Sequence, residues 1–430
     1  MMMTAKNTRE YILSGGADAV ILGECTVKPE NLEKKKERIA NAIDSFIELY
    51  GDREISILSV GGRSEISGNH TDHNRGKVLA AAINLDILAV VSPTDDGTVT
   101  VKSEGFPEDC VLRCEIDSPI EERKFTSAAI IAGMEKAFLD RGLNIGGFTA
   151  YTVSDVLKGS GLSSSAAFEV MIGNILNHLY NDGKVDNVEI AKMAQFAENV
   201  YFGKPCGLMD QTACAVGGFI SIDFEDPTSP VIEKQSFDLS AKGYDLCIID
   251  TGGNHADLNE DYASVPAEMK AVAVYFGKEA LREVSEAELL ENAKDIREKL
   301  GDRHLLRSLH FMQENERVSA QAEALKDEDI DTFFENVIAS GLSSYRYLQN
   351  VYTTKNVSEQ GLSLALCLCE RFLKDRGGAW RVHGGGFAGT VQAFVPSAHT
   401  AEFKEYMEKV FGEGHCYVLS VRRAGAFRII

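Results

Sequence analysis

The sequence predicts an α+β protein of two domains. Its 430 residues and 44% hydrophobic content are enough for a sizeable buried core. The first half mixes strand-like with helix-like segments, whereas residues 266–376 are mainly helical and are followed by late strand-like segments. Two prolines in the segment 225–230 give the best boundary signal of the middle of the chain. We therefore expect an N-terminal domain over residues 1–225 and a C-terminal domain over residues 226–430.

The individual elements follow from periodicity and from turn residues. An apolar helical face, followed by Gly51, predicts a helix over residues 29–50, and helical spacing predicts another over residues 166–179. Segments rich in β-branched and aromatic residues predict strands in the first half at 55–60, 78–91, 98–101, 148–156 and 219–224. The same signals predict late strands at 380–382, 390–395 and 416–421.

Composition limits the class of partner. The formal net charge of −21 disfavours nucleic acid and anionic membranes, so an anionic ligand needs a local positive site. Nine scattered cysteines without a Cys-x-x-Cys pair indicate reduced thiols. The polar N-terminus and the lack of an 18-residue apolar run predict a cytoplasmic protein. The oligomeric state stays open.

The most informative stretch is the glycine and serine turn 159–167, which lies between a predicted strand and a predicted helix. Unpaired backbone N–H groups and the helix dipole at such an entry suit phosphate oxygens. The turn lacks the Lys-Ser or Lys-Thr pair of a Walker A loop. On these residues alone, a serine-capped helix after an ordinary turn remains an alternative.

Two polar segments carry further candidate residues. Residues 61–76 place a dense set of donors and acceptors between two apolar strands, as recognition of a sugar polyol requires, although a long turn bonded to its own backbone is an alternative. In residues 197–212, Asp210 is a candidate to orient a hydroxyl and Glu198 a candidate to hold Mg²⁺, although acidic residues at such turns also serve as helix caps.

Residues 384–389 match the Gly-x-Gly-x-x-Gly dinucleotide fingerprint, but their context contradicts that function. They lie between two strand-like segments, whereas the fingerprint opens a helix early in a βαβ unit. An NAD-dependent dehydrogenase is therefore disfavoured. A tight glycine hairpin close to a nucleotide or to the phosphate loop fits better.

In this order, the four segments resemble those of the GHMP small-molecule kinases and, within them, the galactokinases. Residues 62–76 resemble the signature Gly-Arg-Val-Asn-Leu-Ile-Gly-Glu-His-Thr-Asp-Tyr-Asn-x-Gly, and residues 159–167 nearly reproduce the phosphate loop. Residues 197–211 resemble Ala-Glu-His followed by Pro-Cys-Gly-Ile-Met-Asp-Gln, and residues 384–389 resemble the third, glycine-rich motif. The resemblance implies the two-domain GHMP kinase fold, with the active site in the cleft between the domains.

The resemblance also implies ATP-dependent phosphorylation of the anomeric hydroxyl of galactose, with Mg²⁺. Asp210 would be the catalytic acidic residue, with Arg63 paired to it. The sugar pocket would contain Asn69, His70, Asp72, Gly207 and Tyr262. The nucleotide would bind Gly159, Gly161, Ser163, Ser164, Ser165 and Ala166. The metal would bind Ser165 and Glu198.

Four departures from the signatures leave the sugar open. The Glu that would contact the 6-hydroxyl of the sugar is Asn69, the Asn after Val is Glu65, the Tyr is His73, and a phosphate-loop Pro is Leu157. A neutral amide removes a charge-assisted hydrogen bond to that hydroxyl and also removes repulsion of a 6-carboxylate. A galacturonokinase, or a kinase of another galactose derivative, is the alternative. A sensor that binds sugar and ATP without turnover is disfavoured by the complete serine run of the loop.

Overall fold

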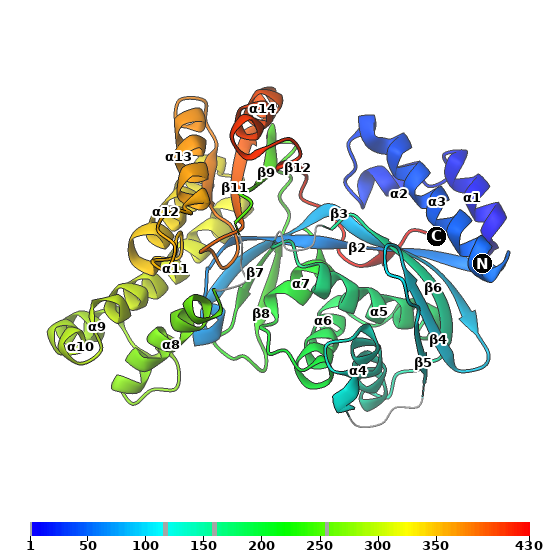
Figure 1. Ribbon diagram of the computed structural model, residues 1–430, viewed down its shortest axis with the longest axis horizontal. Coiled ribbons are helices and arrows are strands. Elements are labelled where there is room, and N and C mark those ends of the chain that lie inside the picture. Colours follow the sequence, from blue (N-terminus) through cyan, green and yellow to red (C-terminus); the bar gives the residue numbers. More distant parts are fainter. Residues whose placement is uncertain (1, 115–118, 157–160, 254–257) are drawn as a thin grey trace.

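The computed structural model describes residues 2–114, 119–156, 161–253 and 258–430, and it contains two β-sheets flanked by helices (Figure 1). The larger sheet has the order β1-β2-β3-β6-β4-β5, with β7 and β13 paired to β3 and β2, and β8 paired to β7. Its strands are β1 (Met3–Thr4), β2 (Glu54–Ser67), β3 (Lys77–Thr94), β4 (Thr98–Ser103), β5 (Cys110–Arg113), β6 (Gly147–Ser154), β7 (Phe219–Asp223), β8 (Val231–Gln235) and β13 (Phe427–Arg428).

Helices cover both faces of this sheet (Figure 1). Alternating residues of β2 explain why: Ile55 and Ile57 pack into the core beneath the N-terminal helices, whereas Leu58 and Val60 pack into the core beneath the opposite helices. The N-terminal group is α1 (Ala5–Leu13), α2 (Asp18–Gly23) and α3 (Leu32–Tyr50). The opposite group is α4 (Ser127–Asp140), α5 (Ser164–Tyr180), α6 (Asn187–Phe196) and α7 (Met209–Val216).

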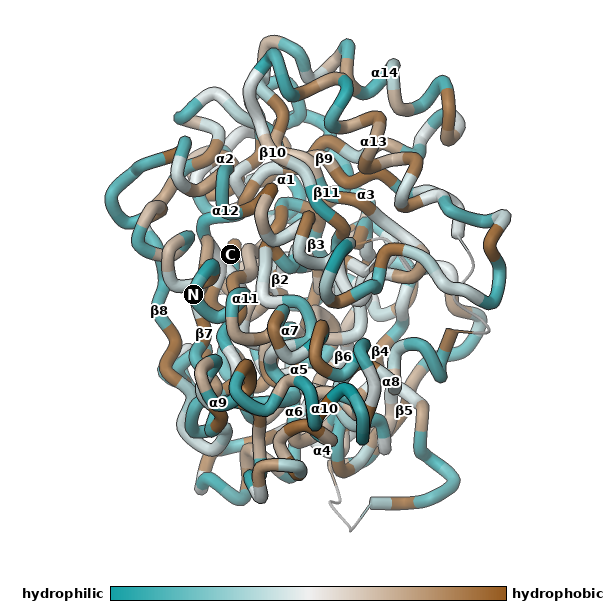
Figure 2. Tube along the Cα trace, turned by 90° about the vertical axis from the view of Figure 1, so that its left-hand side faces the viewer, coloured by the Kyte–Doolittle hydropathy of each residue, from teal (hydrophilic) through white to brown (hydrophobic). Residues whose placement is uncertain are grey.

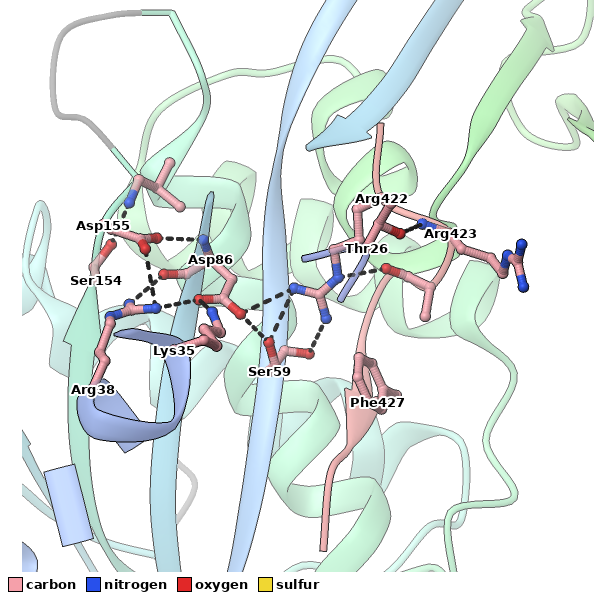
Figure 3. Close-up of polar contacts among 12 residues, drawn as sticks. Thr26, Lys35, Arg38, Ser59, Asp86, Ser154, Asp155, Arg422, Arg423 and Phe427 are labelled. Atoms are coloured by element: carbon pink, nitrogen blue, oxygen red, sulfur yellow. Dashed lines mark hydrogen bonds and ion pairs between the residues drawn. The ribbon is translucent and has the colours of Figure 1, made fainter. Parts of the chain in front are cut away.

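A buried carboxylate holds the N-terminal helices to the sheet (Figure 3). Asp86 of β3 is fully buried and accepts hydrogen bonds from Lys35 Nζ and Arg38 Nη1, each at 2.6 Å, and from Arg422 Nη1 at 3.2 Å. The Ser59 hydroxyl also donates to it. Burial alone would raise the pKa of Asp86, but these three positive charges hold it far below its usual value. The contacts join α3, two central strands and the C-terminal segment.

The smaller sheet has the order β10-β11-β9-β12. Its strands are β9 (Tyr244–Asp250), β10 (Ala379–Val382), β11 (Thr390–Pro396) and β12 (Cys416–Leu419). The accompanying helices are α8 (Asn259–Tyr275), α9 (Glu286–Glu291), α10 (Ala293–Lys299), α11 (Asp302–Lys326), α12 (Ile330–Ser343), α13 (Gly361–Leu373) and α14 (Thr400–Phe411). Hydrophilic and hydrophobic stretches alternate along the outer helices α13 and α14, as amphipathic helices require (Figure 2).

The long strands β2 and β3 pair antiparallel and position the first candidate residues. Their register shifts between Gly61 and Arg63 and again between Glu65 and Ser67. Such irregularities re-aim side chains and are frequent beside active sites. The two shifts therefore bracket Arg63 and Glu65 on β2.

Most predicted elements are confirmed, and so is the α+β fold class. The predicted N-terminal helix begins late, because residues 29–31 form a 3₁₀ turn and α3 starts at Leu32. The short helices α1 and α2 were not predicted. Strands β8 and β13 follow residue 225 in the sequence yet pair within the larger sheet. Among the described residues, no helix is both long and apolar enough to span a membrane.

Candidate active site

An arginine and aspartate pair lies at the centre of the site. Arg63 Nε and Nη2 donate to Asp210 Oδ1 and Oδ2, both at 2.7 Å, which is the bidentate geometry of a strong charge-assisted pair. Asp210 is in the first turn of α7, where the helix dipole favours negative charge. Burial acts to raise the pKa of Asp210, but the charge and hydrogen bonds of Arg63 and the Ser163 hydroxyl lower it overall. Asp210 is therefore ionised at neutral pH.

The same pair contacts the start of α5. Arg63 Nη1 donates to the Gly161 carbonyl, and the Ser163 hydroxyl donates to Asp210 Oδ2 at 2.5 Å. Ser163 has a left-handed backbone with φ of 57° and makes no side-chain cap to α5. The simple serine-cap interpretation is thus wrong for Ser163, whose hydroxyl binds a carboxylate of another helix.

The first turn of α5 presents backbone donors to the space beyond this pair. Ser164, Ser165 and Ala166 are its first three residues, whose N–H groups have no partner within a helix. Ser165 is exposed, and Gly161 also has a positive φ of 74°. An anion fits at such a helix entry. Gly159 and Leu157 lie outside the described residues.

A cavity of about 160 Å³ is lined by residues that are close in the chain to Arg63 and Asp210. It is lined by Glu65, Gly68, Asn69, His70, Asp72, His73, Val78, Met209 and Gly385. Buried Asn69 donates through Nδ2 to Glu65 Oε1 at 2.6 Å and to the Gly384 carbonyl at 2.5 Å. His70 Nε2 donates to the Gly385 carbonyl at 3.0 Å, and burial lowers its pKa. The structure therefore brings predicted sugar-binding residues together around one cavity.

Two further predicted residues, Gly207 and Tyr262, lie against residues that line this cavity. A Cβ atom at Gly207 would lie 2.7 Å from Asp72 Oδ2, so only glycine lets these two segments approach so closely. The Tyr262 hydroxyl donates to the Gly386 carbonyl at 2.7 Å, and its ring packs edge-on against Phe387. Tyr262 thus contacts the glycine hairpin that closes one side of the cavity.

Glu198 lies in a buried carboxylate pair that sequence analysis missed. Gln211 Nε2 donates to Glu198 Oε2 at 2.8 Å and to Glu169 Oε2 at 3.0 Å. Burial and the charge of Glu198 raise the pKa of Glu169 to about 8. Glu169 is four residues after Ser165 on α5, so these two residues share a helix face. Lys204 Nζ lies 3.3 Å from Glu198 Oε1.

These oxygen atoms have the right chemistry for Mg²⁺. Hydroxyl and carboxylate oxygens are hard ligands, and Mg²⁺ commonly takes one or two carboxylates together with phosphate oxygens and water. The part of the chain that the structure describes holds no group of three His, Cys, Asp or Glu that would bind a metal alone. Ser165 and Glu198 therefore fit the predicted ion.

The glycine hairpin joins two antiparallel strands, β10 and β11, and opens no helix. Rejection of the dinucleotide fingerprint is therefore confirmed. His383 at its start is buried, and Nδ1 is hydrogen-bonded to Thr390 Oγ1 at 2.8 Å. Its ring lies 3.4 Å from the position of a Cβ atom at Gly161, and burial lowers its pKa to about 3. A neutral histidine thus packs against the end of the phosphate loop.

Comparison with known proteins assigns the family. The sequence profile "GHMP kinases N terminal domain" matches residues 127–218, and the profile "Galactokinase galactose-binding signature" matches residues 44–93. The chain is 32% identical over 382 residues to a galactokinase of Streptomyces coelicolor, covering 87% of this chain and 94% of that protein. This chain belongs to the galactokinase family of GHMP kinases. A galactokinase of Clostridium tetani is 28% identical, with 84% and 89% of the two chains covered.

Two solved structures of GHMP kinases share the fold of this chain. The structure of Lactococcus lactis galactokinase complexed with galactose superposes with a TM-score of 0.74 at 24% identity, covering 89% of this chain and 98% of that one. A mevalonate kinase structure superposes with a TM-score of 0.60 at 14% identity, covering 85% and 99%. The predicted GHMP kinase fold is confirmed.

Proposed function

We propose that this member of the galactokinase family transfers the terminal phosphoryl group of ATP to the anomeric hydroxyl of galactose, giving galactose 1-phosphate. One observation carries the proposal: the Arg63 and Asp210 pair contacts the phosphate-loop residues Gly161 and Ser163, and the chain neighbours of the pair, Glu65 and Met209, line the polar cavity. A group at that junction is within reach of a phosphate on one side and a sugar on the other.

Asp210 orients the attacking hydroxyl and takes its proton as phosphoryl transfer proceeds. Its lowered pKa makes it a weak base, which is acceptable because the loose transition state of phosphoryl transfer depends mainly on positioning and charge neutralisation. Arg63 keeps the carboxylate ionised and offers positive charge to the transferred group. In this way, the pair aligns the acceptor and stabilises developing negative charge.

ATP binds through its phosphates at the turn before α5, where backbone N–H groups face the ligand. The proposed nucleotide contacts are Gly159, Gly161, Ser163, Ser164, Ser165 and Ala166. Ser165 and Glu198 would hold Mg²⁺, which supplies charge neutralisation at the β- and γ-phosphate oxygens when bound. We also propose, on sequence signals, that residues 1–225 and 226–430 form the two domains flanking the site.

Galactose is favoured over galacturonate by the charge of the cavity. Asn69 is neutral and by itself would tolerate a 6-carboxylate, but its amide is bonded to the Glu65 carboxylate at 2.6 Å. Asp72 also lines the cavity. A uronate would bring its carboxylate close to Asp72 and to Glu65, which burial leaves partly ionised at neutral pH with a pKa of about 7, and like charges repel.

The test is ADP release by the purified chain with Mg-ATP and galactose, compared with Asp210→Asn and the exposed control Asp302→Asn. We expect Asp210→Asn to lower kcat by about 10²–10⁴-fold, the range for a lost proton acceptor, with ATP binding unchanged. Asp302→Asn should match the wild type because its partner Arg297 is on the surface.

Three outcomes would contradict the proposal in different ways. Turnover retained by Asp210→Asn would remove Asp210 from the mechanism. Turnover on galacturonate alone would reassign the substrate. Binding of sugar and ATP without any ADP release would identify a sensor.

A further inference from the structure

A second carboxylate, absent from the predicted site, faces the sugar cavity. Glu65 belongs to β2, two residues beyond Arg63, at about 7 Å along the strand. Its side chain is 8% exposed and lines the same cavity as Asn69, His70 and Asp72. Glu65 therefore lines the cavity at a point away from Arg63 and Asp210, the pair proposed to act on the anomeric hydroxyl.

One oxygen of Glu65 has no hydrogen-bond partner among the residues that the structure describes. Oε1 accepts the Asn69 amide, which is the hydrogen bond that the described residues make to this carboxylate. Arg63 bonds Asp210 and Gly161, and Arg381 Nη1 donates to the Ile66 carbonyl, so the charges of these two arginines act on Glu65 without a hydrogen bond to it. A buried carboxylate without a paired cation is costly unless a donor reaches it. A hydroxyl group of a bound sugar is such a donor.

The position of the Asn69 amide explains how this carboxylate relates to the family signature. In the signature, Asn stands where this chain has Glu65, and Glu stands where it has Asn69. Since Asn69 Nδ2 and Glu65 Oε1 are 2.6 Å apart, exchanging the two residue types moves the carboxylate by roughly one hydrogen-bond length. The cavity thus keeps one carboxylate and one amide, with their positions reversed.

We propose that Glu65 is the residue that selects the sugar, accepting a hydrogen bond from the hydroxyl on carbon 6 or carbon 4 of galactose, the edge remote from the anomeric carbon. Asn69 is a positioning residue that holds Glu65 through its amide. The Ser344 hydroxyl and the Gly384 carbonyl in turn orient Asn69, at 3.3 and 2.5 Å. This inference deepens the proposed function and rests on it.

The first test compares binding of galactose, 6-deoxygalactose and 4-deoxygalactose by titration calorimetry. The wild type should bind one of the deoxy sugars about 10–100-fold more weakly than galactose, as loss of a hydrogen bond to a charged group predicts. Glu65→Gln should bind galactose about tenfold more weakly and that deoxy sugar unchanged. KM for galactose should rise while kcat stays within about threefold, since the residue binds the ring away from the reacting oxygen.

A reciprocal exchange gives a sharper test. Glu65→Asn removes the carboxylate, and Asn69→Glu places two carboxylates within hydrogen-bond distance, so each change alone should weaken galactose binding about tenfold or more. The double variant carrying both changes should recover to within about threefold of the wild type. Glu54→Gln, at the exposed start of β2, is the matched control and should leave all three sugars unaffected. Circular dichroism melting checks that each variant is folded.

Each result has a defined meaning. The role of Glu65 is overturned if a folded Glu65→Gln variant discriminates between galactose and the deoxy sugars as the wild type does. It is also overturned if the double variant binds galactose more weakly than both single variants. Wild-type protein that binds galactose with the expected discrimination but releases no ADP overturns the proposed function and leaves Glu65 as the selecting residue. Wild-type protein that binds no galactose overturns both.

Discussion

Two buried carboxylates lie on the two long strands of the larger sheet, Asp86 on β3 and Glu65 on β2, and their surroundings are opposite. Asp86 is hydrogen-bonded to three cationic side chains and to Ser59 (Figure 3). Glu65 receives one neutral amide and borders a cavity. The pKa values differ accordingly. Positive charge lowers the pKa of Asp86 despite burial, whereas burial raises the pKa of Glu65 to about 7.

This difference in hydrogen bonding distinguishes Asp86, a structural carboxylate, from Glu65, which we propose binds a ligand. Every contact of Asp86 is made by the chain itself, and it joins α3 to the sheet and to the C-terminal segment around Arg422. Glu65 lines a cavity, and the described residues donate to only one of its two carboxylate oxygens. Burial and charge are therefore not sufficient to identify a functional acid, and the completeness of its hydrogen bonds is the better criterion.

The largest expected effect comes from removing the satisfied carboxylate. Asp86→Ala leaves Lys35, Arg38 and Arg422 without their shared partner, two of them largely desolvated. Breaking a buried ion pair from one side costs about 3–5 kcal/mol, which we expect as the loss in free energy of unfolding measured by urea titration. The folded fraction should keep the wild-type KM for galactose.

The surface aspartate Asp140, paired with Lys136, is the matched control. Asp140→Ala should change the free energy of unfolding by less than about 0.5 kcal/mol, because the pair is exposed. A loss below about 1 kcal/mol for Asp86→Ala would mean that the three cations find other partners, and the comparison with Glu65 would fail.

The sequence predicted one contact of the candidate site and missed another. Arg63 and Asp210 were predicted as a pair, and their bidentate contact agrees with that expectation. The contact between Glu65 and Asn69 was not predicted, because residues four apart on a continuous strand lie about 13 Å apart. They meet because the chain turns back after β2, with positive φ at Gly68 and His70.

Long-range partners of charged residues were also beyond prediction. Asp86 interrupts an apolar strand, which signals an unusual residue, but its partners lie 51, 48 and 336 positions away. Periodicity describes one element at a time and carries no information on such pairings. Glu169 was missed for the same reason, since within its apolar helix nothing indicates a second carboxylate from another element.

A smaller effect should appear in the pH dependence of stability. The pKa of Glu65 is about 7 in the folded chain against a usual 4.5, so its contribution is fully present below pH 4.5 and is lost as pH rises through 7. Asp86 acts oppositely, contributing above its usual 3.8 and therefore constantly between pH 5 and 8. Glu65→Gln should thus gain stability relative to wild type, by about 2 kcal/mol, from pH 5 to pH 8.

Urea titrations at pH 5 and pH 8 measure this difference. Glu169 and Glu135 also have raised pKa values and act in the same direction, whereas the lowered pKa values of His70 and His383 act in the opposite direction, so the wild type alone does not isolate Glu65. Comparison with Glu65→Gln isolates the one residue. A constant difference between wild type and variant would show that Glu65 is ionised in the folded chain throughout this range.

The smallest effect should come from removing one of the cations around Asp86. Arg38 is 22% exposed and contacts Asp86, Asp155 and the Val153 carbonyl. Arg38→Met leaves Asp86 paired with Lys35 and Arg422, so the loss in free energy of unfolding should be about 1 kcal/mol. A loss as large as that of Asp86→Ala would instead show that the cations act as one cooperative unit, so that the carboxylate is satisfied only when all of them are present. The contrast with Glu65 would then be sharper. Asp86 would need all of its partners, whereas Glu65 is held by a single neutral amide.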